Sequence, residues 1–153
     1  MKNINHLSPG FEFPETVIQV SAEEQRHKLS CCDIDGSIYG NEVDITMLGL
    51  PTLEILMAAD VPVVGAVHLF QKFHQHSPFV LGEAIVVNGK IKEVLPHERG
   101  CILSCEFRYT DPMGNVRVEA QRSGIVPVGA KEKSHENFRP SEQLDGFLSL
   151  IHI

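Results

Sequence analysis

Asp33, Tyr39 and His76 are the side chains whose types and settings best suit proton-transfer chemistry. A carboxylate and an imidazole can hold one water molecule and move its proton, provided that both lie within hydrogen-bond reach. Asp33 sits among loop-forming residues, so an Asx-turn or a cap is an equally good interpretation. Tyr39 is a weak base, because the ordinary pKa of tyrosine is about 10; a tyrosine in the core or at its rim is the alternative. Asp33 is the best acid/base candidate, and Tyr39 and His76 are further candidates for the same chemistry.

Three histidines alternate along a predicted strand over residues 67–77. His68, His74 and His76 would then lie on one face of that strand. Imidazoles two residues apart can share a metal ion, but no Asp, Glu or Cys in the segment completes a ligand set, so we predict no metal site. His76 could line a substrate tunnel, or it could be a strand histidine bonded to a backbone carbonyl.

A second group of candidates lies at the start of a predicted helix over residues 52–59. Gly49, Pro51 and Thr52 are small and open there, and proline suits a first helical turn. Unpaired amides and the helix dipole at this point could polarise a carbonyl oxygen. The helix is apolar nearly all round, as expected for one that a sheet wraps. Glu54 is its one charge, so we expect it at a polar site or an exposed helix edge.

The elements that must position these residues follow from sequence periodicity. Strict alternation of apolar and polar residues predicts consecutive strands, with a hairpin turn over residues 110–115. The strands are expected over residues 67–77, 84–95, 101–109 and 116–126. One apolar helix followed by such strands predicts an α+β protein, a single hotdog fold in which an antiparallel sheet wraps a central helix.

Shorter elements precede the apolar helix. A short strand is expected over residues 15–20, and Ser21 with Glu24 forms a capping box that begins a helix reaching about Ser30. A further short helix is expected over residues 42–48. These segments form the connection that leads into the central helix.

Composition excludes several classes of protein. The 153 residues carry a formal charge of −7, which argues against a general nucleic-acid binder, because such a protein needs a basic face. No apolar run is long enough to span a bilayer, and the first residues do not read as a signal peptide. The four cysteines lack metal-site spacing, and we expect reduced thiols in a cytoplasmic protein. They are Cys31, Cys32, Cys101 and Cys105.

The chain divides into three segments. Residues 1–14 are expected to form an irregular amino-terminal arm, and residues 15–128 the hotdog domain. Residues 129–153 read as a polar tail with an apolar docking end at residues 147–151. The tail is too short to build a core of its own.

From residue 15 to residue 128 the sequence resembles the MaoC-like hotdog family of (R)-specific enoyl-thioester hydratases and 3-hydroxyacyl-thioester dehydratases. It is most similar to the amino-terminal half of that family, which is often non-catalytic. There a His opens a strand, a second His stands just before a proline, and Gly-Asp follows. The matching residues are His68, His76, Pro78 and Gly82-Glu83, with Glu83 in place of Asp.

Catalytic members of the family carry Gly-Asp-x-Asn-Pro-x-His before the hotdog helix. Asp33 stands at the aspartate position, but Asp35 replaces Asn and Gly36 replaces Pro. The histidine position falls on Ile38, or on Tyr39 if one residue is inserted. Tyr39 is also what many amino-terminal halves carry at that point.

The resemblance implies a hydratase or dehydratase, a lyase that interconverts 3-hydroxyacyl and 2-enoyl thioesters of CoA or acyl carrier protein. Asp33, Tyr39 and His76 would be catalytic. Gly49, Pro51, Thr52, Glu54 and His68 would contact the substrate. CoA or phosphopantetheine would enter with the substrate, with no other cofactor. A homodimer or a hotdog heterodimer is expected.

Two alternatives stay open at this point. The chain could be a non-catalytic acyl-binding hotdog subunit that needs a catalytic partner. It could also be a hotdog thioesterase that activates water with Glu54 or Asp33.

Overall fold

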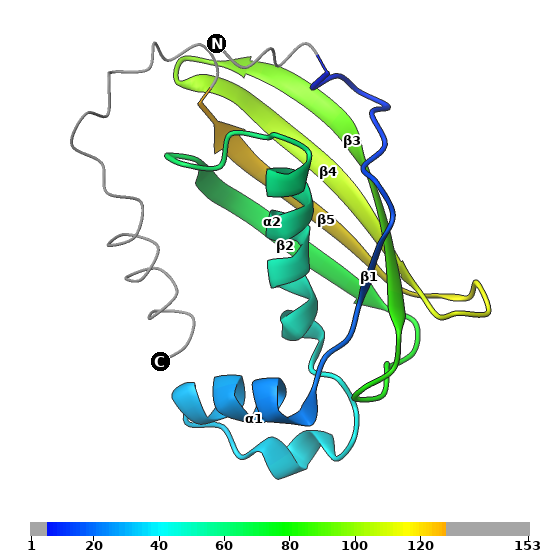
Figure 1. Ribbon diagram of the computed structural model, residues 1–153. Coiled ribbons are helices and arrows are strands. Elements are labelled where there is room, and N and C mark those ends of the chain that lie inside the picture. The colour runs from blue at the N-terminus through cyan, green and yellow to red at the C-terminus, as the bar shows by residue number, and fades with distance from the viewer. Residues whose placement is uncertain (1–5, 128–153) are drawn as a thin grey trace.

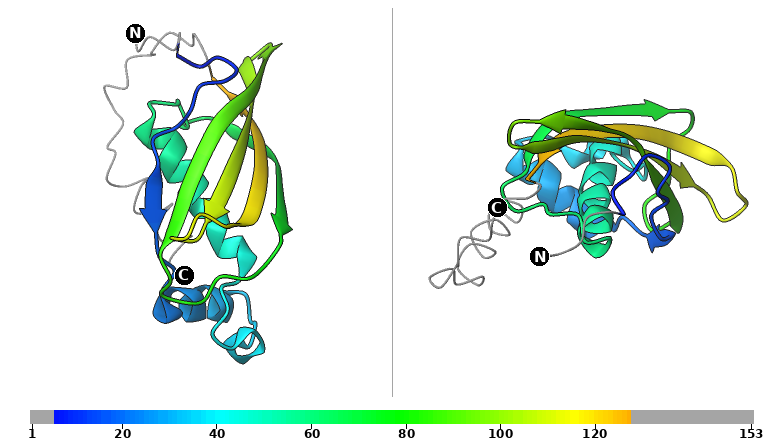
Figure 2. Two further views of the ribbon diagram at one scale, coloured as in Figure 1. Left: turned by 90° about the vertical axis from the view of Figure 1, so that its right-hand side faces the viewer. Right: turned by 90° about the horizontal axis from the view of Figure 1, so that it is seen from above.

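The computed structural model describes residues 6–127. Five antiparallel strands form one sheet in the order β1-β3-β4-β5-β2. Helix α2 lies across the concave face of this curved sheet (Figures 1 and 2). The strands are β1 Thr16–Ile18, β2 Val67–Gln75, β3 Ile85–His97, β4 Gly100–Thr110 and β5 Val116–Val126. The predicted α+β hotdog fold is therefore confirmed.

The central helix α2 (Gly49–Ala58) buries one side only. Thr52, Ile55 and Leu56 are buried against the sheet, whereas Glu54 and Met57 are exposed. The sheet wraps the helix as predicted, but it curls over a single face of α2 and leaves the outer side of the helix exposed (Figure 2).

Helix α1 (Ala22–Cys31) begins and ends as its sequence dictates. Ser21 and Glu24 form the predicted capping box. At the other end Asp33 takes a left-handed conformation, with φ of 56°. The amides of Asp33 and Ile34 donate to the carbonyls of Ser30 and Leu29, the two bonds of a Schellman cap.

The connection from α1 to α2 contains two 3-10 turns, η1 (Gly36–Tyr39) and η2 (Ile45–Leu48). Asp44 is buried and caps η2, accepting from the amide and hydroxyl of Thr46, and it pairs with Lys28 of α1 at 3.4 Å. Burial raises the pKa of Asp44, but the Thr46 hydrogen bonds and the charge of Lys28 outweigh burial and hold the pKa below its usual value. Asp44 thus fixes the approach to α2.

The described part of the amino-terminal arm runs beside β3. The amide of Phe13 donates to the carbonyl of Gly89, and the amide of Gly10 donates to that of Ile91. The Phe13 ring is buried and stacks on Phe107 at 5.8 Å between centroids. The arm therefore contributes to the core. The predicted docking end at residues 147–151 lies outside the described residues, and no helix within residues 6–127 is long and apolar enough to cross a membrane.

A β-bulge in β2 corrects the histidine prediction. The register between β2 and β5 shifts between His68 and Phe70, so that His68 lies opposite Gly124 and His74 opposite Glu119. Gly124 belongs to the alternate residues of β5 that face the core, whereas Glu119 belongs to those that face outward. His68 therefore faces α2 while His74 and His76 are on the other side of the sheet, and the prediction of one shared face is wrong.

Candidate functional site

Polar side chains of the sheet meet the first turn of α2. The buried phenol of Tyr109, on β4, donates to the carbonyl of Leu48 at 2.6 Å. Arg122, on β5, donates from Nη1 to the hydroxyl of Thr52 at 2.9 Å, and that hydroxyl donates to the carbonyl of Gly49 at 2.6 Å. The bonds from Tyr109 and Arg122 thus hold the start of the helix against the sheet, and the bond from Thr52 to Gly49 lies within the helix.

Arg122 is a half-buried cation without a counter-charge among residues 6–127. No carboxylate of these residues lies within 4.0 Å of it, and its ionisable neighbours are the side chains of Cys105 and Tyr109. Burial lowers the pKa of Arg122 and raises that of the Cys105 thiol to about 12. Burial also raises the pKa of Tyr109, so both neighbours stay neutral at pH 7. The guanidinium charge is therefore not neutralised by the groups around it.

Gln71 places a free donor at the same helix turn. Its residue lies directly opposite Arg122 in the β2–β5 register. The amide nitrogen Nε2 is buried and has no hydrogen-bond partner within residues 6–127. A Cβ at Gly49 would lie 3.3 Å from this nitrogen, so any larger residue at position 49 would crowd the Gln71 amide. A buried donor without an acceptor is costly, which makes this position suited to a ligand oxygen.

An apolar cavity of about 230 Å³ opens beside Arg122, between α2 and the inner face of the sheet. Its wall includes Leu53, Leu56, Leu103 and Val126, with Arg122 and His68 as polar members. Burial, followed by the charge of Arg122, lowers the pKa of His68, so this imidazole is neutral at pH 7. The cavity joins aliphatic surface to a small set of polar groups, which is the usual make-up of a ligand site.

The predicted substrate-binding residues are partly gathered here. Thr52 bonds Arg122, and His68 lines the cavity with it. The amide of Gly49 is already bonded to the carbonyl of Thr46, and Pro51 has no amide to offer. The helix start therefore presents fewer free amides than the sequence suggested. Glu54 lies at an exposed helix edge, one of its two predicted settings.

The three predicted catalytic residues are not brought together. Asp33 is exposed in the cap of α1, Tyr39 is half-buried at the end of η1, and no hydrogen bond joins the two side chains in the described part of the chain. His76 is exposed and its ring lies 2.9 Å from a carboxylate oxygen of Glu119. The predicted alternative of a backbone carbonyl partner for this ring is therefore wrong.

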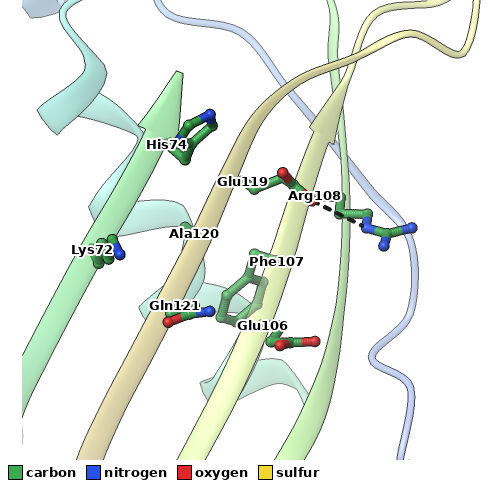
Figure 3. Close-up of a pocket in the computed structure, with 8 residues that line it drawn as sticks. All are labelled: Lys72, His74, Glu106, Phe107, Arg108, Glu119, Ala120 and Gln121. Atoms are coloured by element: carbon green, nitrogen blue, oxygen red, sulfur yellow. Dashed lines mark ion pairs between the residues drawn. The ribbon is translucent and has the colours of Figure 1, made fainter. Parts of the chain in front are cut away.

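The outer face of the sheet carries a second, charged depression. Figure 3 shows Lys72, His74, Glu119 and Arg108 on neighbouring strands, with Arg108 paired to Glu119 at 3.8 Å. Positive and negative side chains alternate across this face, as on a solvated surface. No group of three or more His, Cys, Asp or Glu residues within residues 6–127 could hold a metal ion.

Arg122 and Gln71 were not among the site residues predicted from the sequence. For Arg122 the signal was present, because residue 122 follows Val118 and Ala120 in the two-residue alternation that faces the core. A cation at an inward position is rare without a functional or structural reason. For Gln71 there was no such signal, since its facing depends on the bulge in β2.

Comparisons with known proteins agree with the fold. No protein-family model matches the sequence, and no curated protein matches it. Among solved structures, an (R)-hydratase from A. caviae involved in PHA biosynthesis is similar, with a TM-score of 0.64 and 14% identity over 80% of this chain and 99% of that one.

Two further solved structures are similar to this chain. The C-terminally truncated HadBC (3R-hydroxyacyl-ACP dehydratase) complex from Mycobacterium tuberculosis gives a TM-score of 0.66 at 17% identity, covering 76% of this chain and 95% of that one. A MaoC-like dehydratase gives 0.62 at 12% identity, covering 77% of this chain and 42% of that one. Residues 6–127 thus adopt the hotdog fold of the MaoC-like hydratases and dehydratases.

Proposed function

We propose that this chain binds the acyl part of a CoA or acyl-carrier thioester, as the acyl-binding subunit of an assembly that interconverts 3-hydroxyacyl and 2-enoyl thioesters. The observation that carries the proposal is the apolar cavity between α2, from Leu53 onward, and the sheet: Arg122 lines its wall, and Gln71, opposite Arg122, has an amide nitrogen without a partner within residues 6–127. CoA or phosphopantetheine would come with the substrate. The exposed free thiols of Cys31 and Cys32 suit a reducing compartment, and we propose the cytoplasm.

The two parts of an acyl thioester match the two parts of this site. The acyl chain is aliphatic and gains free energy on leaving water, about 0.8 kcal/mol for each buried methylene. The carbonyl oxygen is a hydrogen-bond acceptor, and the Nε2 of Gln71 is a buried donor without an acceptor within residues 6–127. Binding of a thioester would therefore satisfy a polar atom that this part of the chain leaves unpaired.

The separation of the predicted catalytic residues supports a subunit role. The backbone position of Asp33 in the α1 cap accounts for this residue without chemistry. Water activation would then come from a partner hotdog chain that carries its own Asp and His. Strand β2 is one of the two edge strands of the sheet, and Leu69 and Phe70 on it are each nearly half exposed. An edge strand with apolar exposure suits pairing with a second chain, in a homodimer or a hotdog heterodimer.

The proposal is tested with crotonyl-CoA and the full-length chain. We expect calorimetry to detect binding, while the enoyl absorbance stays constant when the chain is alone. We expect hydration when a hotdog chain carrying the complete Gly-Asp-x-Asn-Pro-x-His loop is added. Asp33→Asn should leave that activity unchanged, and Asp35→Asn is the matched control, since it changes a neighbouring exposed carboxylate.

Other outcomes would replace the proposal. Hydration by the chain alone that Asp33→Asn abolishes and Asp35→Asn does not would make the protein an enzyme with Asp33 as its acid/base. Release of free CoA thiol would make it a thioesterase. Absence of crotonyl-CoA binding would overturn the acyl-binding role itself.

A further inference from the structure

A neutral acyl group offers no negative charge to pair with the guanidinium of Arg122. A guanidinium removed from water into apolar surroundings costs free energy unless an anion pairs with it. Its only protein acceptor within residues 6–127 is the Thr52 hydroxyl. Arg122 lines the cavity, so its Nε and Nη2 atoms, which make no hydrogen bond within residues 6–127, remain available to a ligand there.

We infer that the cavity recognises a carboxylate, which Arg122 holds while the hydrocarbon part of the ligand packs on Leu56 and Leu103. A guanidinium can bind a carboxylate through two parallel N–H···O bonds, a geometry that a neutral carbonyl cannot match. The hydrogen bond to Thr52 fixes the Nη1 atom of Arg122. Because the guanidinium is planar, this bond also restricts the orientation of its other two nitrogens.

The spacing of Arg122 and Gln71 along α2 restricts how far apart the carboxylate and the carbonyl of the ligand can be. Arg122 bonds Thr52, whereas Gln71 packs on Gly49, three residues earlier on α2. Three residues correspond to about 4.5 Å along a helix axis. The inference rests on the proposed function in one respect: if Gln71 takes the thioester carbonyl, the carboxylate must lie only a few bonds away. A short dicarboxylic acyl thioester such as succinyl-CoA meets this requirement.

Room for such a group is available. Engineered apolar cavities of about 150 Å³ hold benzene-sized molecules, and this cavity measures about 230 Å³. A four-carbon or six-carbon acyl group therefore fits without expansion of the core.

The test compares matched ligands by calorimetry at pH 7, where an aliphatic carboxyl is ionised. Succinyl-CoA and butyryl-CoA differ in the second carboxylate, and hexanoate and hexanol differ in the same charge without CoA. We expect the full-length chain to bind the charged member at least tenfold tighter, as a charge-assisted hydrogen bond implies. In Arg122→Met we expect the order to reverse, because a carboxylate would enter an apolar cavity unpaired. Arg122→Lys should keep the original order.

Arg108→Met is the control, since this arginine lies on the outer face of the sheet, and it should change nothing. A melting curve for each variant verifies folding; if Arg122→Met does not fold, Arg122→Lys and the ligand order in the native chain still decide. Equal or weaker binding of both charged members to the native chain would overturn the inference while leaving the proposed function intact. Hexanoate binding that depends on Arg122, with no binding of either CoA ester, would retain the carboxylate site for free acids and overturn the proposed function.

Discussion

Gly89→Val is expected to lower the free energy of unfolding by about 3 kcal/mol or to prevent folding, the upper end of the cost of overpacking a core. A Cβ at Gly89 would lie 2.4 Å from Cδ1 and 2.6 Å from Cε1 of the Phe107 ring. Phe107 is buried and stacks on Phe13 of the amino-terminal arm. The ring therefore cannot yield without displacing the arm, whose Phe13 amide also bonds the Gly89 carbonyl.

Urea unfolding followed by circular dichroism measures this effect. Asn88→Val is the matched control, because it introduces the same side chain one residue earlier at an exposed position of β3. We expect the control to shift stability by no more than about 0.5 kcal/mol. An unchanged unfolding midpoint in Gly89→Val would mean that Phe107 does not pack over residue 89.

Arg117→Met is expected to cost about 2 kcal/mol of stability, because it leaves a half-buried carboxylate without its partner. Arg117 donates to Glu83 at 2.7 Å, to Ser77 at 3.2 Å and to the carbonyl of Pro78. Its guanidinium also lies 4.6 Å from the centre of the Phe79 ring. This network ties the β2–β3 connection to β5, and it accounts structurally for the Pro78 and Glu83 part of the family-like pattern.

Thermal unfolding of Arg117→Met measures the loss, with Arg108→Met as the control. The Arg108 side chain is 68% exposed, against 18% for Arg117, so its ion pair should contribute at most about 1 kcal/mol. The double variant Arg117→Met with Glu83→Gln should lose less than the sum of the single changes. Strict additivity would show that Arg117 and Glu83 do not interact.

Alternation and capping explain why the strands and α1 could be predicted from sequence. The alternation that predicted a strand over residues 101–109 has its apolar members at residues 103, 105, 107 and 109, and all four are buried. Ser21 and Glu24 are a local signal, since both hydrogen bonds of the capping box lie within four residues. For the strands and for α1, whose sequence signals are periodic or local, the predicted bounds therefore agree with the observed ones to within one or two residues.

The bulge in β2 and the start of α2 could not be predicted in the same way. One extra residue near Leu69 turns His68 toward α2 and His74 away from it, and nothing in the apolar pattern of β2 marks this position. Helix α2 continues directly from η2, so that the Gly49 amide is used within the turn. A separate helix beginning at residue 52 was expected, because Pro51 suits a first helical turn. Both differences depend on contacts with other parts of the fold rather than on local sequence.

We expect an acyl chain to lie in the cavity between α2 and the inner face of the sheet. Calorimetric titration of acetyl-, butyryl- and hexanoyl-CoA tests this placement. We predict that affinity rises about fourfold for each added methylene. This dependence should disappear in Ala66→Phe, which fills the cavity wall from an exposed position, and persist in Ala58→Phe, which is exposed outside that wall. Affinity that does not change with chain length in the native protein would contradict this placement.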